Sequence, residues 1–279
     1  MKNWDKSPSA RRHAYLVMSL IAIPASLLLV SLMSTGLVAS EGRESSEGIF
    51  QRGVSYWNGQ GVEQDYSKAA NLFQEAAELG DARAQNNLGY MYEKGLGAPQ
   101  DYAAAVKWYR KAAEQGLAIA QDNLAGMCDQ GLGAPRDLSE AADWYRKAAE
   151  QGLASAQNSL GVMYQMGEGT PRDYAQAVKW YLKAAEQGLD YAQDNLAGMY
   201  YAGLGVQKND SEAIKWYRKA AKQGHADAQN SLGVMYDEGL GVHRDYTQAL
   251  KWYQEAAGRG VQAAQDNLAG LCKEATVGC

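Results

Sequence analysis

Apolar residues recur with helical spacing along most of the chain. Ala84, Leu88, Met91 and Tyr92 are three or four positions apart or adjacent, so one face of a helix carries all of them. A second apolar series with the same spacing runs through residues 102–113. The two series predict two amphipathic helices that follow one another closely.

The residues between and around these helices are typical of loops and helix ends. Gly95, Gly97 and Pro99 interrupt the helical pattern and predict a bend. Asp101 is placed to cap the second helix, and Gly116 is placed to end it. The segment therefore predicts a helix hairpin. The cap position recurs as Asp65, Asp137, Asp173, Asn209 and Asp245. The terminal glycine recurs as Gly80, Gly152, Gly188, Gly224 and Gly260.

The hairpin pattern repeats every 36 residues. One hairpin cannot bury its own apolar face, but stacked hairpins can. Long runs of Val, Ile and Thr are absent after the N-terminus, which argues against strands. We therefore predict an all-α fold, a right-handed α/α solenoid superhelix of stacked hairpins with a concave surface. The blocks are 48–83, 84–119, 120–155, 156–191, 192–227, 228–263 and the partial block 264–279.

A second period of 72 residues lies on top of the first. The string AQDNLAG stands at 120–126, 192–198 and 264–270, whereas the intervening copies read AQNNLGY or AQNSLGV. Duplication of a two-hairpin unit is our hypothesis for this alternation.

The repeat resembles a known family. Residues 156–188, AQNSLGVMYQMGEGTPRDYAQAVKWYLKAAEQG, match nearly throughout the pattern of Sel1-like repeats, which are relatives of tetratricopeptide repeats. The resemblance extends over residues 48–275. It implies an α/α solenoid that scaffolds other proteins and is common in exported bacterial proteins, but it does not imply one partner.

Comparison with tetratricopeptide repeats implies that the first helix of each hairpin lines the concave groove. At 100° per residue, Asn86, Tyr90 and Glu93 lie opposite the apolar face. A ladder of Asn and Asp at this position can bind an extended peptide through its backbone amides. The alternative is a row of solvated side chains repeated by duplication. The ladder consists of Asn86, Asp122, Asn158, Asp194, Asn230 and Asp266. The other predicted groove residues are Tyr90, Asp129, Val162, Tyr201 and Asp237.

Charge narrows the class of partner. The chain has a formal net charge of −5, and residues 41–279 carry 23 basic and 31 acidic residues. An acidic body argues against nucleic acid as a partner. Acidity near the ladder favours a basic protein segment.

The first 40 residues differ from the rest. Basic residues precede an uncharged stretch, 14–40, that is largely apolar, which is typical of an export signal. Cleavage after Ser40 and retention of residues 14–38 as an inner-membrane anchor both remain open, since the apolar run is nearly long enough to span a bilayer. Residues 41–47 are expected to form a polar linker before the solenoid of 48–275. We expect a periplasmic or secreted body.

The sequence contains little that could carry catalysis. His225 and His243 occupy positions that other repeats fill with Leu117 or Gln207, so we expect solvated rather than catalytic imidazoles. The Gly-x-Gly loops connect helix to helix, which indicates bends rather than phosphate loops. No HExxH motif, zinc-type Cys/His cluster or SxxK motif is present. We therefore expect no cofactor and no metal.

Two of the three cysteines are close in sequence. Cys128 and Cys272 occupy equivalent positions four repeats apart, too far for a disulfide. Cys272 and Cys279 both lie in the terminal half-repeat, where either a disulfide or two free thiols would fit.

These observations favour a non-enzymatic interaction scaffold, exported to the bacterial envelope, that binds a protein or peptide in its groove. Two alternatives remain. One is an enzyme acting on cell-wall or β-lactam compounds, by analogy with a cysteine-rich subgroup of the family. The other is a secreted factor that binds a host protein.

Overall fold

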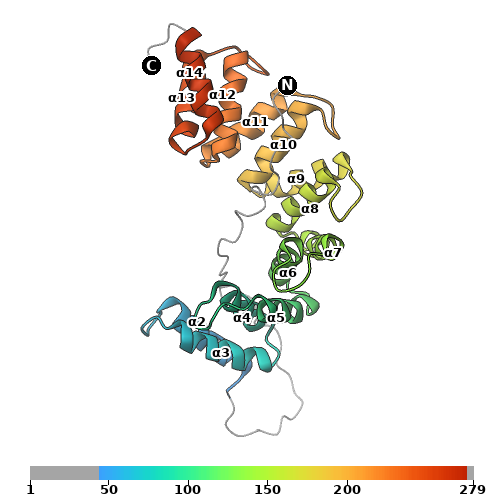
Figure 1. The fold of residues 1–279 in the computed structure, drawn as a ribbon, viewed down its shortest axis with the longest axis vertical. Helices are drawn as coiled ribbons and strands as arrows, with labels where there is room; N and C mark the ends of the chain where they lie inside the picture. The colour runs from blue at the N-terminus through green and yellow to red at the C-terminus, as the bar shows by residue number, and fades with distance from the viewer. Residues whose placement is uncertain (1–43, 275–279) are drawn as a thin grey trace, which may run out of the picture. The chain divides into compact units, whose positions relative to one another are not determined.

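The computed structural model describes residues 44–274, which form thirteen α-helices and no strand. The chain divides into two compact units, one up to Gln100 and one from Asp101 (Figure 1). The first unit contains α2 (Ser46–Asn58), α3 (Tyr66–Glu78) and α4 (Ala82–Lys94). The second unit contains α5 (Tyr102–Glu114), α6 (Ala118–Gln130), α7 (Leu138–Glu150), α8 (Ala154–Met166), α9 (Tyr174–Glu186), α10 (Asp190–Ala202), α11 (Asp210–Lys222), α12 (Ala226–Glu238), α13 (Tyr246–Gly258) and α14 (Gln262–Glu274).

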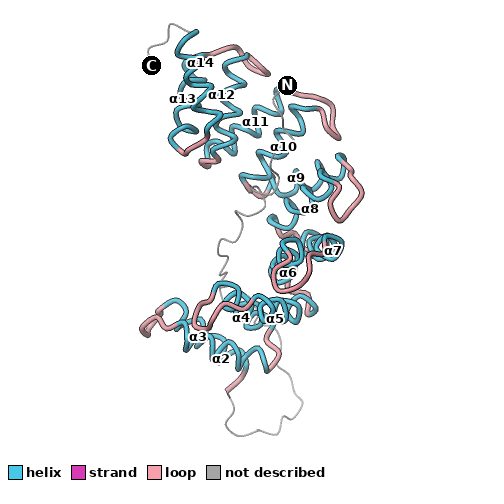
Figure 2. Tube along the Cα trace, viewed as in Figure 1, coloured by secondary structure: helices cyan, strands magenta, loops and turns pink. Residues whose placement is uncertain are grey.

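Within each unit, helices that are consecutive in sequence pack against one another, and short loops join their ends (Figure 2). The even-numbered helices are the first helices of the hairpins, and the odd-numbered helices are the second helices. This arrangement confirms the predicted all-α architecture of stacked hairpins. The apolar face of each first helix is also confirmed, since Ala120, Leu124 and Met127 are each at most 3% exposed.

The predicted caps of the second helices are confirmed. Asp137 accepts a hydrogen bond at Oδ1 from the backbone N–H of Glu140 at 2.9 Å. The same bond begins each of the other second helices, with acceptors Asp65, Asp101, Asp173, Asn209 and Asp245. The predicted terminal glycines follow these helices with positive φ, from 86° to 96°, a conformation that glycine adopts without strain.

A loop glycine brings neighbouring hairpins together. Gly133 has a φ of 75°, and a Cβ there would lie 2.2 Å from the carbonyl oxygen of Tyr102, in the first turn of α5. Only a residue without a side chain permits this approach. The loop of each such hairpin therefore rests on the start of the preceding second helix, and Gly97, Gly169, Gly205 and Gly241 repeat the contact.

A buried glutamine joins three successive helices. Gln121 of α6 donates from Nε2 to the carbonyl oxygen of Ala113 at 3.1 Å, at the end of α5. Its Oε1 accepts from Nε2 of Gln151 at 2.8 Å, just after α7. The same clamp recurs at Gln157 and Gln193. The hydrophobic pattern does not predict this role for the glutamine of the AQ pair.

The last clamp is incomplete. Gln229 donates to Ala221 at 3.2 Å, but its Oε1 is buried without a hydrogen-bond partner. Arg259 occupies the position at which Gln151, Gln187 and Gln223 supply the donor in earlier repeats.

Tyrosine packs closely on glycine in one of the two kinds of copy that make up the 72-residue period. A Cβ on Gly161 would lie 2.7 Å from the ring of Tyr181. In the alternate copies alanine fills this position and glycine follows it, as in Gly126, where a Cβ would lie 3.7 Å from the hydroxyl of Tyr145. Close packing of a tyrosine ring on glycine therefore distinguishes Gly161 from Gly126, where a side chain has room.

We predict that Arg259→Gln raises the free energy of unfolding by about 1 kcal/mol, because it supplies the donor that the buried Oε1 of Gln229 lacks. Urea unfolding of the full chain measures the change. Arg259→Ala is the control, since it removes the arginine without adding an amide. Equal stability of the two variants would contradict the role assigned to the clamp.

A matched pair of glycine substitutions tests the tyrosine packing. Gly161→Ala should lower the free energy of unfolding by about 1–3 kcal/mol, because its Cβ meets the ring of Tyr181. Gly126→Ala should raise it by about 0.5–1 kcal/mol, because the site has room and alanine favours a helix. Thermal unfolding of both variants provides the comparison, and changes of the same sign would refute the explanation.

Candidate binding surface on the first helices

The candidate surface lies on α6, α8, α10 and α12 of the second unit. We call it the first-helix face, meaning the side of these four helices opposite their buried alanine, leucine and methionine positions. The four helices contain seven acidic residues and no lysine or arginine. These acids are Asp122, Asp129, Asp190, Asp194, Asp227, Asp237 and Glu238.

The second helices have the opposite balance. Helices α5, α7, α9 and α11 contain eleven basic and seven acidic residues. Lysines also cover the half-buried or buried indoles on this side, as Lys147 does over Trp144 at 3.8 Å from the ring centroid. The two sets of helices in the second unit therefore differ in charge.

Much of the Asn/Asp ladder is used to join repeats. Asn195 donates to Oδ1 of Asn158 at 2.9 Å. Asn267 makes the same bond to Asn230 at 2.9 Å. These bonds run between successive first helices, so the ladder contributes to the stacking itself.

The ladder is not a row of solvated side chains. Asn158 and Asp194 are 2% exposed and Asn86 is 8% exposed, whereas Asp266 is exposed. Glu93, which the helical spacing placed opposite the apolar face, is also buried, with 4% of its surface exposed. A helical wheel assigns one buried face to each helix, but a first helix in a stack also packs against its neighbouring first helices. The role of the ladder in binding a partner stays a prediction.

Asp122 is a ladder residue whose pKa is raised in the folded chain. Burial raises the pKa of Asp122 from its usual value near 3.8 to about 6, and the hydrogen bond from Oγ of Ser155 at 2.7 Å opposes only part of this rise. The equivalent residues Asn158 and Asn230 carry no charge, so the fold accepts a neutral amide at this position.

The other predicted groove residues have varied surroundings. Val162 is 5% exposed and belongs to the core between α9 and α10, so its side chain is a packing residue. Asp129 is buried and forms an ion pair with Arg136 at 3.5 Å. Tyr201 is half-buried with Lys208 over its ring at 5.5 Å.

Two further predicted residues complete the set. Asp237 is half-buried and accepts a hydrogen bond from the hydroxyl of Tyr253 at 3.3 Å. Tyr90 belongs to the first unit, where it packs edge-on against Trp57 with ring centroids 5.9 Å apart.

The expectation of a solvated imidazole is wrong for His225, which is buried. Its side chain is 8% exposed, accepts the backbone N–H of Ala228 at Nδ1 at 3.2 Å, and packs edge-on against Tyr191. The position is the N-cap of α12, which leucines fill in other repeats without a side-chain bond. His243 is exposed, as expected. Among residues 44–274 no group of three or more side chains has an arrangement that could hold a metal ion.

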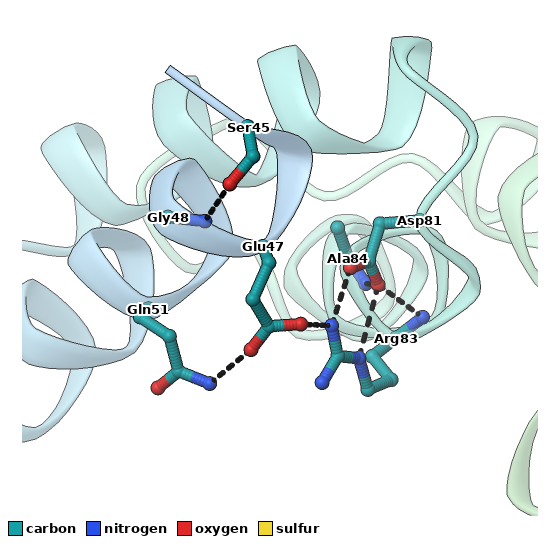
Figure 3. A network of polar contacts seen from close by, with 7 residues as sticks. All are labelled: Ser45, Glu47, Gly48, Gln51, Asp81, Arg83 and Ala84. Atoms are coloured by element: carbon teal, nitrogen blue, oxygen red, sulfur yellow. Dashed lines mark hydrogen bonds and ion pairs between the residues drawn. The ribbon is translucent and has the colours of Figure 1, made fainter. Parts of the chain in front are cut away.

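A network in the first unit could not be predicted from the repeat pattern. Arg83 donates to Asp81 at 2.6 Å and to Glu47 (Figure 3). Its guanidinium lies 4.4 Å from the ring centroid of Phe50. The hydrogen bond from Arg83 lowers the pKa of Glu47. The network ties α2 to α4. No other repeat has arginine at this position, so the periodicity carries no signal for it.

Several expectations concern residues outside the described range. Residues 1–40, with the export signal or anchor, are among them. Cys279 also lies outside the described residues, so its disulfide with the half-buried Cys272 stays a prediction.

Cys128 is buried, and burial raises the pKa of its thiol to about 12. Within the part of the chain that the structure covers, no helix is both long and apolar enough to cross a bilayer.

The fold and surface define a helical-repeat protein, and comparison with known proteins identifies the family. The Sel1 repeat model matches six consecutive segments, 46–81, 82–117, 118–153, 154–189, 190–225 and 226–261. The chain therefore belongs to the Sel1 repeat family, whose members generally act as protein-interaction scaffolds. The matched segments begin two residues before the blocks chosen from the sequence.

Two solved structures are similar over most of the chain. One is a protective antigen present in uropathogenic Escherichia coli strains, with an SLR fold; it is 41% identical with a TM-score of 0.79 over 84% of this chain and 50% of that one. The chain thus spans half the length of that antigen. The other is a Sel1 repeat protein from Oxalobacter formigenes, 34% identical with a TM-score of 0.76 over 82% of this chain and 91% of that one. No curated protein matches the chain.

The raised pKa of Asp122 predicts a pH-dependent stability. Because its pKa is higher in the folded chain than in the unfolded chain, the ionised carboxylate destabilises the fold at neutral pH, and this cost falls as the pH drops toward 4. Asp122→Asn should therefore raise the free energy of unfolding at pH 7.5. We expect the difference in free energy of unfolding between this variant and the wild type to be smaller by about 1–2 kcal/mol at pH 5 than at pH 7.5. Urea unfolding at both pH values measures this, and an advantage independent of pH would contradict it.

Proposed function

We propose that the chain is a non-enzymatic scaffold that binds a basic protein segment on the first-helix face of the second unit. The single observation that carries the proposal is the charge of the four helices α6, α8, α10 and α12, which contain seven acids and no lysine or arginine. Asp227 and Glu238 are exposed, and Asp190 and Asp237 are half-buried. The family supports the general role of protein binding, and the charge supports the kind of partner.

The geometry of the stack suits an extended segment. Packed helices lie about 8–10 Å apart, and an extended chain rises about 3.3 Å per residue, so about three residues of a partner cross each repeat. Hydrogen bonds such as Asn195 to Asn158 hold neighbouring first helices together, so the face is organised before a partner arrives. A preorganised face loses little entropy on binding.

We place this scaffold in the bacterial envelope, on the ground that the basic and then apolar first 40 residues have the composition of an export signal or anchor. A specific observation favours a second candidate, a factor exposed to a host. The 41% identical protein from uropathogenic Escherichia coli is a protective antigen. Detection of the chain on the cell surface or in the medium would favour the second candidate, and retention in the periplasm would favour the first.

The binding proposal predicts the effect of charge reversal on partner recovery. Asp227 and Glu238 are exposed on first helices, whereas Glu150 and Glu186 are exposed on second helices. The full chain would be used as bait in envelope extracts. Changing Asp227 and Glu238 to lysine should reduce the recovered partner at least about tenfold, because it places positive charge against a basic segment.

The matched control changes Glu150 and Glu186 to lysine, which alters the net charge of the chain by the same amount. This control should retain the partner. Loss of the partner from both variants would show a dependence on net charge alone, and loss from the control only would move the binding site to the second helices.

A further inference from the structure

The repeats differ most where their first helices end. Alanine, glutamine and leucine recur unchanged at the third, fourth and seventh positions of α6, α8, α10 and α12. The last two positions of the same helices share no such pattern. We call these four pairs the variable row, which consists of Asp129–Gln130, Gln165–Met166, Tyr201–Ala202 and Asp237–Glu238.

The pairs of the variable row lie at one level of the stack. Each pair directly precedes a left-handed glycine that ends its helix, with φ between 68° and 73°. The first helices are held side by side, as the bond from Asn195 of α10 to Asn158 of α8 shows. The row therefore crosses the first-helix face from one repeat to the next.

The row changes in chemical character along the unit. At its centre, α8 presents Met166 and α10 presents Tyr201, both half-buried. One repeat further, α12 presents the half-buried Asp237 and the exposed Glu238. An apolar contact with acidic groups beside it is the arrangement of an anchoring site with a charged rim.

The residues of the variable row differ from one repeat to the next, whereas the core residues do not. The core positions recur because every hairpin must pack in the same way. The row positions also pack, since Met166 lies against the core between α9 and α10 and Asp237 accepts a hydrogen bond from the hydroxyl of Tyr253, but different residues do this in different repeats. Because the residues differ from one repeat to the next, the parts of these side chains that remain exposed offer a partner different contacts in different repeats.

We infer that the partner segment carries an apolar side chain about six residues away from a basic side chain. This inference rests on the proposed function and adds the sequence class of the segment. Met166 and the Asp237–Glu238 pair are two repeats apart, which is about 16–20 Å for packed helices. An extended segment covers this span in about six residues. The apolar group lies against Met166 and Tyr201, and the basic group lies against Asp237 and Glu238.

Labelled synthetic peptides and the full chain test this inference by fluorescence anisotropy. The main probe has two leucines, a six-residue Gly/Ser spacer and three arginines. The comparison probes shorten the spacer to two residues, replace the leucines by serine, or keep the arginines alone. We expect the main probe to bind at least about tenfold more tightly than each of the others, a difference typical of one well-buried apolar anchor.

Protein variants assign the two ends of the probe. Tyr201→Ser should weaken binding of the main probe toward that of the arginine-only probe and leave the latter unchanged. Changing Asp237 to Asn together with Glu238 to Gln should weaken both probes. The control changes Glu150 and Glu186 to Gln on the second helices, and it should alter neither.

The outcomes separate this inference from the proposed function. If the arginine-only probe binds as tightly as the main probe and still depends on Asp237 and Glu238, the anchor is refuted and the basic partner stands. If the two-residue spacer binds best, the assigned spacing is wrong. If no probe binds although the charge-reversal experiment recovers a partner, the inferred sequence class of the segment is overturned while the scaffold role remains.

Discussion

The stacking in the second unit depends on the hydrogen bonds of a buried glutamine in each of the helices α6, α8 and α10. Through Gln121, Gln157 and Gln193, the side-chain amide donates to the end of one second helix and accepts a hydrogen bond from just after the next. A buried amide without hydrogen-bond partners costs free energy. Each hairpin is therefore stable only in the orientation relative to its neighbours that forms these bonds. The loop glycines, such as Gly133, allow the close contact that this orientation requires.

The sequence predicted features that depend on local spacing. The helices, the capping Asp and Asn residues, the loop glycines and the Ala–Leu–Met core all follow from residues within one hairpin. It did not reveal the glutamine clamp or the burial of Asn158, because these depend on groups in other helices, up to 37 positions away. The cap by His225 is local, but leucine fills the same position of α6 without a side-chain bond, so the repeat pattern carries no signal for it. The candidate surface was therefore predicted as a region, but Val162 was assigned to it although it packs in the core.

The same stacking explains how a repetitive chain presents a specific surface. Fixed core positions bring α6, α8, α10 and α12 into one row, and these four helices carry acids but no lysine or arginine. The second helices carry the compensating bases, so the charges of the unit are separated by layer rather than mixed. In the proposed binding mode, specificity depends on the few positions that differ between repeats, while stability depends on the many that do not.

Site-specific photo-crosslinking in living cells tests the central claim most directly, because it captures a partner whose identity has not been determined. A photoreactive residue would replace Gln130 or Glu238 on first helices, and Lys147 or Lys219 on second helices; all four side chains are exposed. A scaffold that binds through its first-helix face should form a cross-linked species of one defined mass from the first-helix positions and none from the second-helix positions. Cross-links formed only from Lys147 or Lys219 would contradict binding at this face.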